Sequence, residues 1–86
     1  MTNVLAAVER AHRAVIEVEL GHRAPALLEA LHSANKPTIE QSDALMDVMI
    51  NAMGEHYGPG HIPDERGVAI DDAIGGYLLA WPIRRD

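Results

Sequence analysis

The sequence predicts an all-α fold, a small three- or four-helix bundle in which the third and longest helix is central. Apolar residues recur at a spacing of about 3.6 residues in four segments, which is typical of amphipathic helices. The apolar residues are mainly alanine, leucine, isoleucine, valine and methionine, with no phenylalanine and one tryptophan, and alanine and leucine favour helix. Because the chain has 86 residues, we expect a single helical domain over residues 1–86.

The first two helices are expected over residues 3–20 and 25–34. The first has an apolar stripe on one face, and Gly21 is expected to end it. The second opens with Pro25, which suits the first position of a helix. Because only residues 21–24 separate the two segments, they form either an antiparallel hairpin or one long helix kinked at Pro25, and the sequence leaves both open.

The third helix is expected from residue 39 to about His56, because Thr38 and Gln41 have the spacing of a capping box. Its apolar arc spans about 200° of the helical wheel at about 100° per residue. This arc consists of Leu45, Met46, Val48, Met49, Ile50, Ala52 and Met53. One neighbouring helix cannot cover an arc of that width. The third helix is therefore central in the domain, or part of it faces another chain.

The fourth helix is expected from Val68 or Ile70 to Trp81. Asp71 and its neighbour Asp72 would lie in the first turn, where negative charge meets the positive end of the helix dipole. The Gly75–Gly76 pair should cost about 1 kcal/mol per glycine relative to alanine. We expect Gly75 to permit the close approach of another helix, with a break in the helix there as the alternative. Residues 83–86 are expected to fray.

The charge and the composition exclude several classes of function. A net charge of −6 disfavours nucleic acids and anionic membrane surfaces. It fits solubility alone, which is the more common reason for such a charge, or a basic protein partner. The absence of cysteine excludes disulfides, thiolate metal sites and cysteine nucleophiles. No apolar run is long enough to cross a bilayer, and we expect no signal peptide at the N-terminus, because the charges of Glu9 and Arg10 interrupt its apolar stretch. We therefore expect a cytoplasmic protein.

The candidate partner-binding surface is the apolar side of the third and fourth helices together with the acids beside it. Met46, Met49 and Met53 form a stripe along the third segment. Such a stripe is more often plain core, but methionines can also adapt their shape to a bound partner. The predicted partner-binding residues are Met46, Met49, Ile50, Met53, Asp43, Asp47, Tyr77 and Trp81.

A candidate metal site lies in residues 53–67, MGEHYGPGHIPDERG. The glycines and prolines of this stretch are what a bend between two helices requires, and we expect it to be a connection. The remaining residues are of types that can bind zinc, namely His56, His61, Asp64 and Glu65. Their spacing matches neither HExxH nor an EF-hand loop, so the metal site is the alternative interpretation and no cofactor is expected.

The function that these features favour is that of a non-catalytic protein–protein interaction module. It would be an immunity- or antitoxin-like inhibitor, or an accessory subunit, that binds a basic partner, and a homodimer is also expected. The alternative is a small metal-binding or enzymatic domain that uses the histidines and acids of residues 55–65. An enzyme is the less favoured reading, because Ser33 and Ser42 are the only serines and neither stands in a GxSxG elbow.

Overall fold

The computed structural model describes residues 3–56, 62 and 64–82. These residues form a short 3-10 helix and four α-helices, and none of them lies in a strand. The elements are η1 (Leu5–Ala7), α1 (Arg10–Arg23), α2 (Pro25–Ser33), α3 (Ile39–Gly54) and α4 (Glu65–Ala80). The predicted all-α bundle is confirmed. The predicted fraying of residues 83–86 lies outside the described part of the chain.

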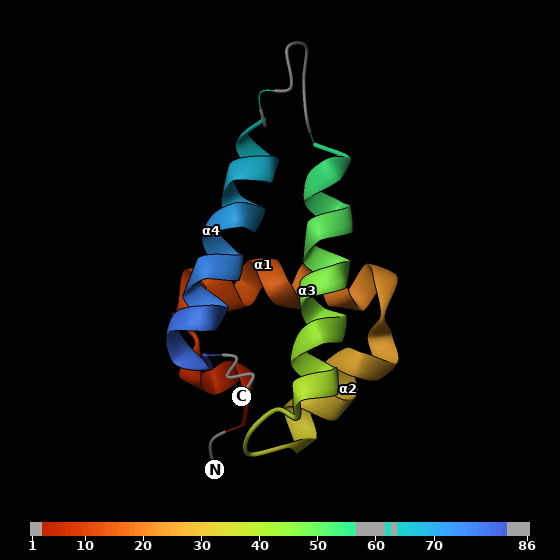
Figure 1. Ribbon diagram of the computed structural model, residues 1–86, viewed down its shortest axis with the longest axis vertical. Helices are drawn as coiled ribbons and strands as arrows, with labels where there is room; N and C mark the ends of the chain where they lie inside the picture. The colour runs from red at the N-terminus through yellow and green to blue at the C-terminus, as the bar shows by residue number, and fades with distance from the viewer. Residues whose placement is uncertain (1–2, 57–61, 63, 83–86) are drawn as a thin grey trace.

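The helices form two layers. Figure 1 shows α3 and α4 running side by side in opposite directions, with α1 crossing behind both of them. The α2 helix turns back from the end of α1 and packs against α1 and α3. The third helix therefore contacts each of the other three α-helices, which confirms its central position, and α1 shares that role.

The first helix begins later than the sequence predicts, at Arg10 instead of residue 3. Residues 5–7 form the separate turn η1, and the Asn3 side chain before it accepts a hydrogen bond from the Ala6 amide at 2.9 Å. The chain is then extended at Val8. The physical reason is tertiary, since the Val4 amide donates to the Ala34 carbonyl at 3.0 Å and Val4 is fully buried.

The first helix also ends later than predicted, because it continues through Gly21 to Arg23. Ala24 alone separates α1 from α2, and its backbone leaves the helical region with φ −149° and ψ 64°. The two segments are therefore distinct helices that pack against each other, as the hairpin interpretation requires, and the single kinked helix is wrong.

The predicted cap of α3 is confirmed. The Thr38 hydroxyl accepts a hydrogen bond from the Gln41 amide at 3.0 Å, and the Gln41 side chain accepts one from the Thr38 amide at 3.0 Å. The two bonds satisfy amide groups that have no partner inside the helix. The helix ends at Gly54, slightly before the expected His56.

The α4 helix begins at Glu65, before the predicted start, because the Asp64 carboxylate caps it by accepting from the Gly67 amide at 2.8 Å. The glycine pair does not break the helix. The sequence predicts a close helix approach at Gly75, but in the structure the close approach occurs at Gly76. A Cβ added to Gly76 would lie 2.7 Å from Cγ of His12 on α1, whereas nothing lies within 4 Å of one added to Gly75.

The core receives side chains from η1 and from every α-helix. Its buried apolar members are Val4, Leu5, Val8, Ile16, Leu20, Leu31, Leu45, Met49, Ala52, Ile70, Ala73 and Tyr77. Among the described helices, none has both the length and the hydropathy needed to cross a membrane.

Candidate functional site

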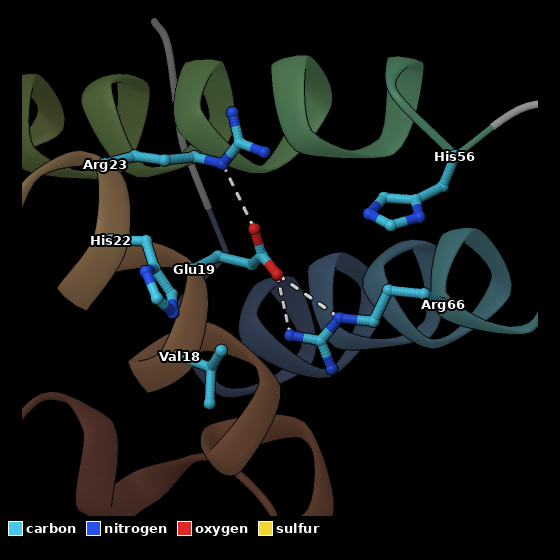
Figure 2. Close-up of a pocket in the computed structure, with 6 residues that line it drawn as sticks. All are labelled: Val18, Glu19, His22, Arg23, His56 and Arg66. Carbon is cyan, nitrogen blue, oxygen red and sulfur yellow. Dashed lines mark hydrogen bonds and ion pairs between the residues drawn. The ribbon is translucent and has the colours of Figure 1, made fainter.

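A buried carboxylate, that of Glu19, lies at the point where α1 meets α4. Glu19 is only 7% exposed, although it is a glutamate on the apolar side of α1 between Ile16 and Leu20. Figure 2 shows its carboxylate between two guanidinium groups. Arg66 of α4 donates to Oε2 from Nη2 at 2.7 Å and from Nε at 3.2 Å, and Arg23 donates to Oε1 from Nε at 3.1 Å.

The same network reaches the end of α3 through Arg23. Its two terminal nitrogens donate to the Glu55 carboxylate at 2.6 and 3.0 Å, in the two-pronged geometry that suits a guanidinium and a carboxylate. Arg66, Glu19, Arg23 and Glu55 therefore form one continuous chain of ion pairs. This chain joins α4, α1 and the residue that caps the C-terminus of α3.

These contacts keep the carboxylates ionised. Burial by itself would raise the pKa of Glu19, but hydrogen bonds from Arg66 and Arg23 outweigh it and lower that pKa below its ordinary value. The hydrogen bonds that Arg23 donates lower the pKa of Glu55, and the same bonds to the Glu55 and Glu19 carboxylates raise the pKa of Arg23. A carboxylate held in this state is a poor proton donor or acceptor near neutral pH.

The ion pairs border an open hollow of about 580 Å³, which we call the Glu19 hollow. It is lined by Val18, Glu19, His22, Arg23, His56 and Arg66, and Figure 2 shows all six side chains. Both arginines already donate to carboxylates, so their positive charge is largely neutralised within the hollow. This network of ion pairs therefore stabilises the packing of α1 against α4 and against the end of α3. The sequence alone did not predict it.

The candidate metal residues are brought together only in part. His56 and Asp64 are close, with 3.2 Å between Nδ1 and Oδ2, and the Asp64 amide donates to the His56 carbonyl at 2.7 Å. Asp64 also caps α4, and the hydrogen bond from the Gly67 amide is the main cause that lowers its pKa. Glu65 is exposed and His61 lies outside the described residues. Within the described part of the chain, no three histidines or acids gather as metal ligands would.

The second region of interest is the front of the α3–α4 pair, on the side opposite α1 in Figure 1. Because α1 crosses behind both helices, no helix of the described chain lies in front of them. Helical geometry places several apolar side chains there, given that Ser42 and Tyr77 face each other in the core. We call this surface the α3–α4 face, and it consists of Ile39, Met46, Ile50, Met53, Ile74 and Leu78.

The side chains of this face are half-buried or exposed. Ile39 and Ile50 are each 52% exposed. Met46 and Met53 are half-buried and rest on the core from outside, and so do Ile74 and Leu78 of α4. The apolar arc of α3 is therefore only partly covered by the described chain.

The predicted partner-binding residues divide between this face and the core. Met46, Ile50 and Met53 lie on the α3–α4 face, and Asp43 and Asp47 lie along its edge. Three others do not belong to it. Met49 and Tyr77 have no exposed surface, and the indole of half-buried Trp81 donates to the Val4 carbonyl at 2.8 Å.

Sequence reasoning missed the Glu19 network, although one signal was present. Glu19 falls on the buried side of α1, where an acid needs a cationic partner, and Arg23 follows one turn later. The second partner, Arg66, is distant in the sequence and could not be found this way.

Comparison of the chain with protein-family models, with curated proteins and with solved structures finds no match in any of the three. What the protein does is therefore inferred from its own residues.

Proposed function

We propose that the protein is a non-catalytic interaction module that binds a basic protein through the α3–α4 face. One observation carries this proposal: neighbouring half-buried and exposed apolar side chains of α3 and α4 lie where the described chain supplies no covering helix. Contiguous apolar surface of this kind is typical of binding sites, whereas single exposed apolar residues are ordinary.

Covering this face would contribute free energy through the hydrophobic effect. Removing apolar area from water stabilises a complex by about 25 cal/mol per Å² before the costs of association. Ile50 and Ile39 of this face each still expose about half of their surface. A partner that covers both, together with the two half-buried methionines, would bury the part of the apolar arc of α3 that the described chain leaves uncovered on this face.

The charge of the two helices favours a basic partner. No lysine or arginine occurs in α3, and the one in α4, Arg66, already donates to Glu19. The acids of α3 and α4 are Glu40, Asp43, Asp47, Glu65, Asp71 and Asp72. Such a one-sided distribution speeds the encounter with a positively charged protein and disfavours acidic ones.

Two biological roles fit this description, an immunity- or antitoxin-like inhibitor and an accessory subunit of a larger assembly. The expected homodimer stays a prediction. Helices α3 and α4 of a second copy would offer the acids of the first no cation besides Arg66, which is already paired with Glu19, so charge complementarity favours a different protein.

The test is affinity capture combined with sedimentation velocity. We expect wild-type protein to retain a basic partner at low salt, and Ile50→Asp to lose it, because a charge would be placed among the apolar side chains of this face. Leu79→Asp is the matched control, since Leu79 is 86% exposed on α4 but lines a hollow together with His12 of α1, away from the α3–α4 face. Capture that is equal for all three proteins would contradict the proposal, provided that each melts at a similar temperature.

A further inference from the structure

We infer that the segment bound on the α3–α4 face is an amphipathic α-helix with basic residues along both of its edges. This inference rests on the proposed function and specifies the kind of partner. It is carried by the spacing of the residues on the face and by the position of the acids beside them.

The exposed row of α3 has the spacing of a helix-packing seam. Its apolar members are Ile39, Met46, Ile50 and Met53, and Asp43 occupies the intervening position at the edge of the face, so that the five positions alternate in steps of four and three residues. Helices that pack lengthwise on one another repeat their contacts at about 3.5 residues, as these steps do. None of the five side chains is buried, and the row is about 21 Å long at about 1.5 Å per residue.

The α4 helix supplies the second side of the docking surface. Asp71, Ile74 and Leu78 follow one another at steps of three and four residues on the front of α4. Because Ser42 and Tyr77 are in contact and the two helices are antiparallel, Ile74 lies near the level of Met46. A helix placed between the two rows would contact both, at the usual interaxial distance of about 8–10 Å.

An extended segment would fit this surface less well. A bound strand satisfies its backbone by pairing with the edge of a sheet, and the described residues contain no strand. Its amide and carbonyl groups would then lie over apolar side chains without partners, which is unfavourable. A helix satisfies these groups internally and presents only side chains.

Charge specifies what the bound helix carries at its edges. Asp47 stands on the outer side of the α3 row, and Asp71 stands on the α4 row. Lysine or arginine on each edge of the bound helix would lie opposite these two carboxylates, as flanking charges do in paired helices. An acidic helix would meet like charge on both sides.

The test uses three synthetic peptides of about 14 residues, the length that spans the row. The first two contain only leucine and lysine in equal composition, with leucine either at 3.5-residue spacing or at every second position. The third has the 3.5-residue spacing with glutamate in place of lysine. Binding to the purified protein is measured by fluorescence anisotropy at low and at high salt.

We expect the helix-spaced lysine peptide to bind at least about tenfold more tightly than either other peptide. Ile50→Asp should weaken this binding about tenfold, while Leu79→Asp should leave it unchanged. Asp47→Asn combined with Asp71→Asn should reduce the dependence of affinity on salt.

Failure of the inference can be separated from failure of the proposed function. If the strand-spaced lysine peptide binds as tightly and is equally sensitive to Ile50→Asp, the helix inference is overturned and the binding face stands. If the lysine peptides bind wild type and Ile50→Asp equally tightly, the binding is only electrostatic. The helix inference and the proposed function then both fail. If the glutamate peptide binds as well as the lysine peptide, the basic character of the partner is wrong.

Discussion

The hydroxyl groups of Ser42 on α3 and Tyr77 on α4 lie 2.7 Å apart inside the core. Tyr77 is fully buried, and Ser42 is 4% exposed. Burial raises the pKa of Tyr77 and the hydrogen bond with Ser42 partly opposes this, so the phenol stays neutral. The pair sets the register between the two helices that form the proposed binding face.

Tyr77→Phe should therefore destabilise the protein. We expect a loss of about 1–2 kcal/mol in the free energy of unfolding, because the Ser42 hydroxyl would be left buried without its partner. Ser42→Ala should cost a similar amount, whereas the double variant should lose less than the sum. Urea titrations of the four proteins measure this, and strict additivity would show that the hydroxyls do not interact.

Glu19→Gln should weaken the packing of α1 against α4. We expect a loss of about 1–3 kcal/mol at neutral pH, because two guanidinium groups lose their shared carboxylate. The matched control is Glu17→Gln on the same helix, whose partially exposed pair with His32 is worth no more than about 0.5 kcal/mol. Equal losses of stability in Glu19→Gln and Glu17→Gln would contradict the role of Glu19 in holding α1 against α4.

The contribution of Glu19 should also depend on pH. Its pKa in the folded state is lowered, so the stabilisation is present above the ordinary value of 4.5 and is lost as the pH falls through the folded value. The difference between wild type and Glu19→Gln should thus be constant near neutral pH and should shrink below 4.5. Thermal unfolding between neutral and acidic pH tests this, and a difference that grows on acidification would refute it.

The two adjacent glycines of α4 should respond in opposite directions to alanine. Gly76→Ala should lower the melting temperature, because the new Cβ would overlap the His12 ring. Gly75→Ala should raise stability by up to about 1 kcal/mol, since no atom lies near the new methyl group and alanine favours the helix. Calorimetry measures the melting temperatures of the two variants. A higher melting temperature for Gly76→Ala would show that α1 and α4 are not in close contact at Gly76 and His12.

Trp81→Phe should loosen the attachment of the N-terminal segment. The indole donates to the Val4 carbonyl, and the Val4 amide donates in turn to the Ala34 carbonyl. We expect faster hydrogen exchange at the Val4 amide, with little change at the Gln41 amide inside the capping box. If Val4 is as well protected as in wild type, the indole contact is not what holds this segment.

The helices themselves follow from local features of the sequence. The spacing of apolar residues locates four segments, and the Thr38–Gln41 pair and Pro25 mark starts that the structure confirms. The local signals failed at the beginning of α1. There the repeat continued through residues 3–8, but burial of Val4 and its bond to Ala34 drew the chain into a separate turn.

The candidate site was less accessible to sequence reasoning. An apolar arc wider than one neighbour can cover was visible in α3, and the row that remains uncovered includes Met46, Ile50 and Met53. Which members of the arc would be covered was not visible, so Met49 and Tyr77 were predicted at the surface and lie in the core.

By itself, then, the sequence determined the helical class, the starts of the second and third helices, and the acidic character of the third and fourth helices. These depend on periodicity and on hydrogen bonds within a single turn. Only the tertiary structure decided that Glu19 pairs with Arg66, 47 residues away, and that Ser42 meets Tyr77, 35 residues away. Such pairs depend on how whole helices cross, and no local pattern records the crossing.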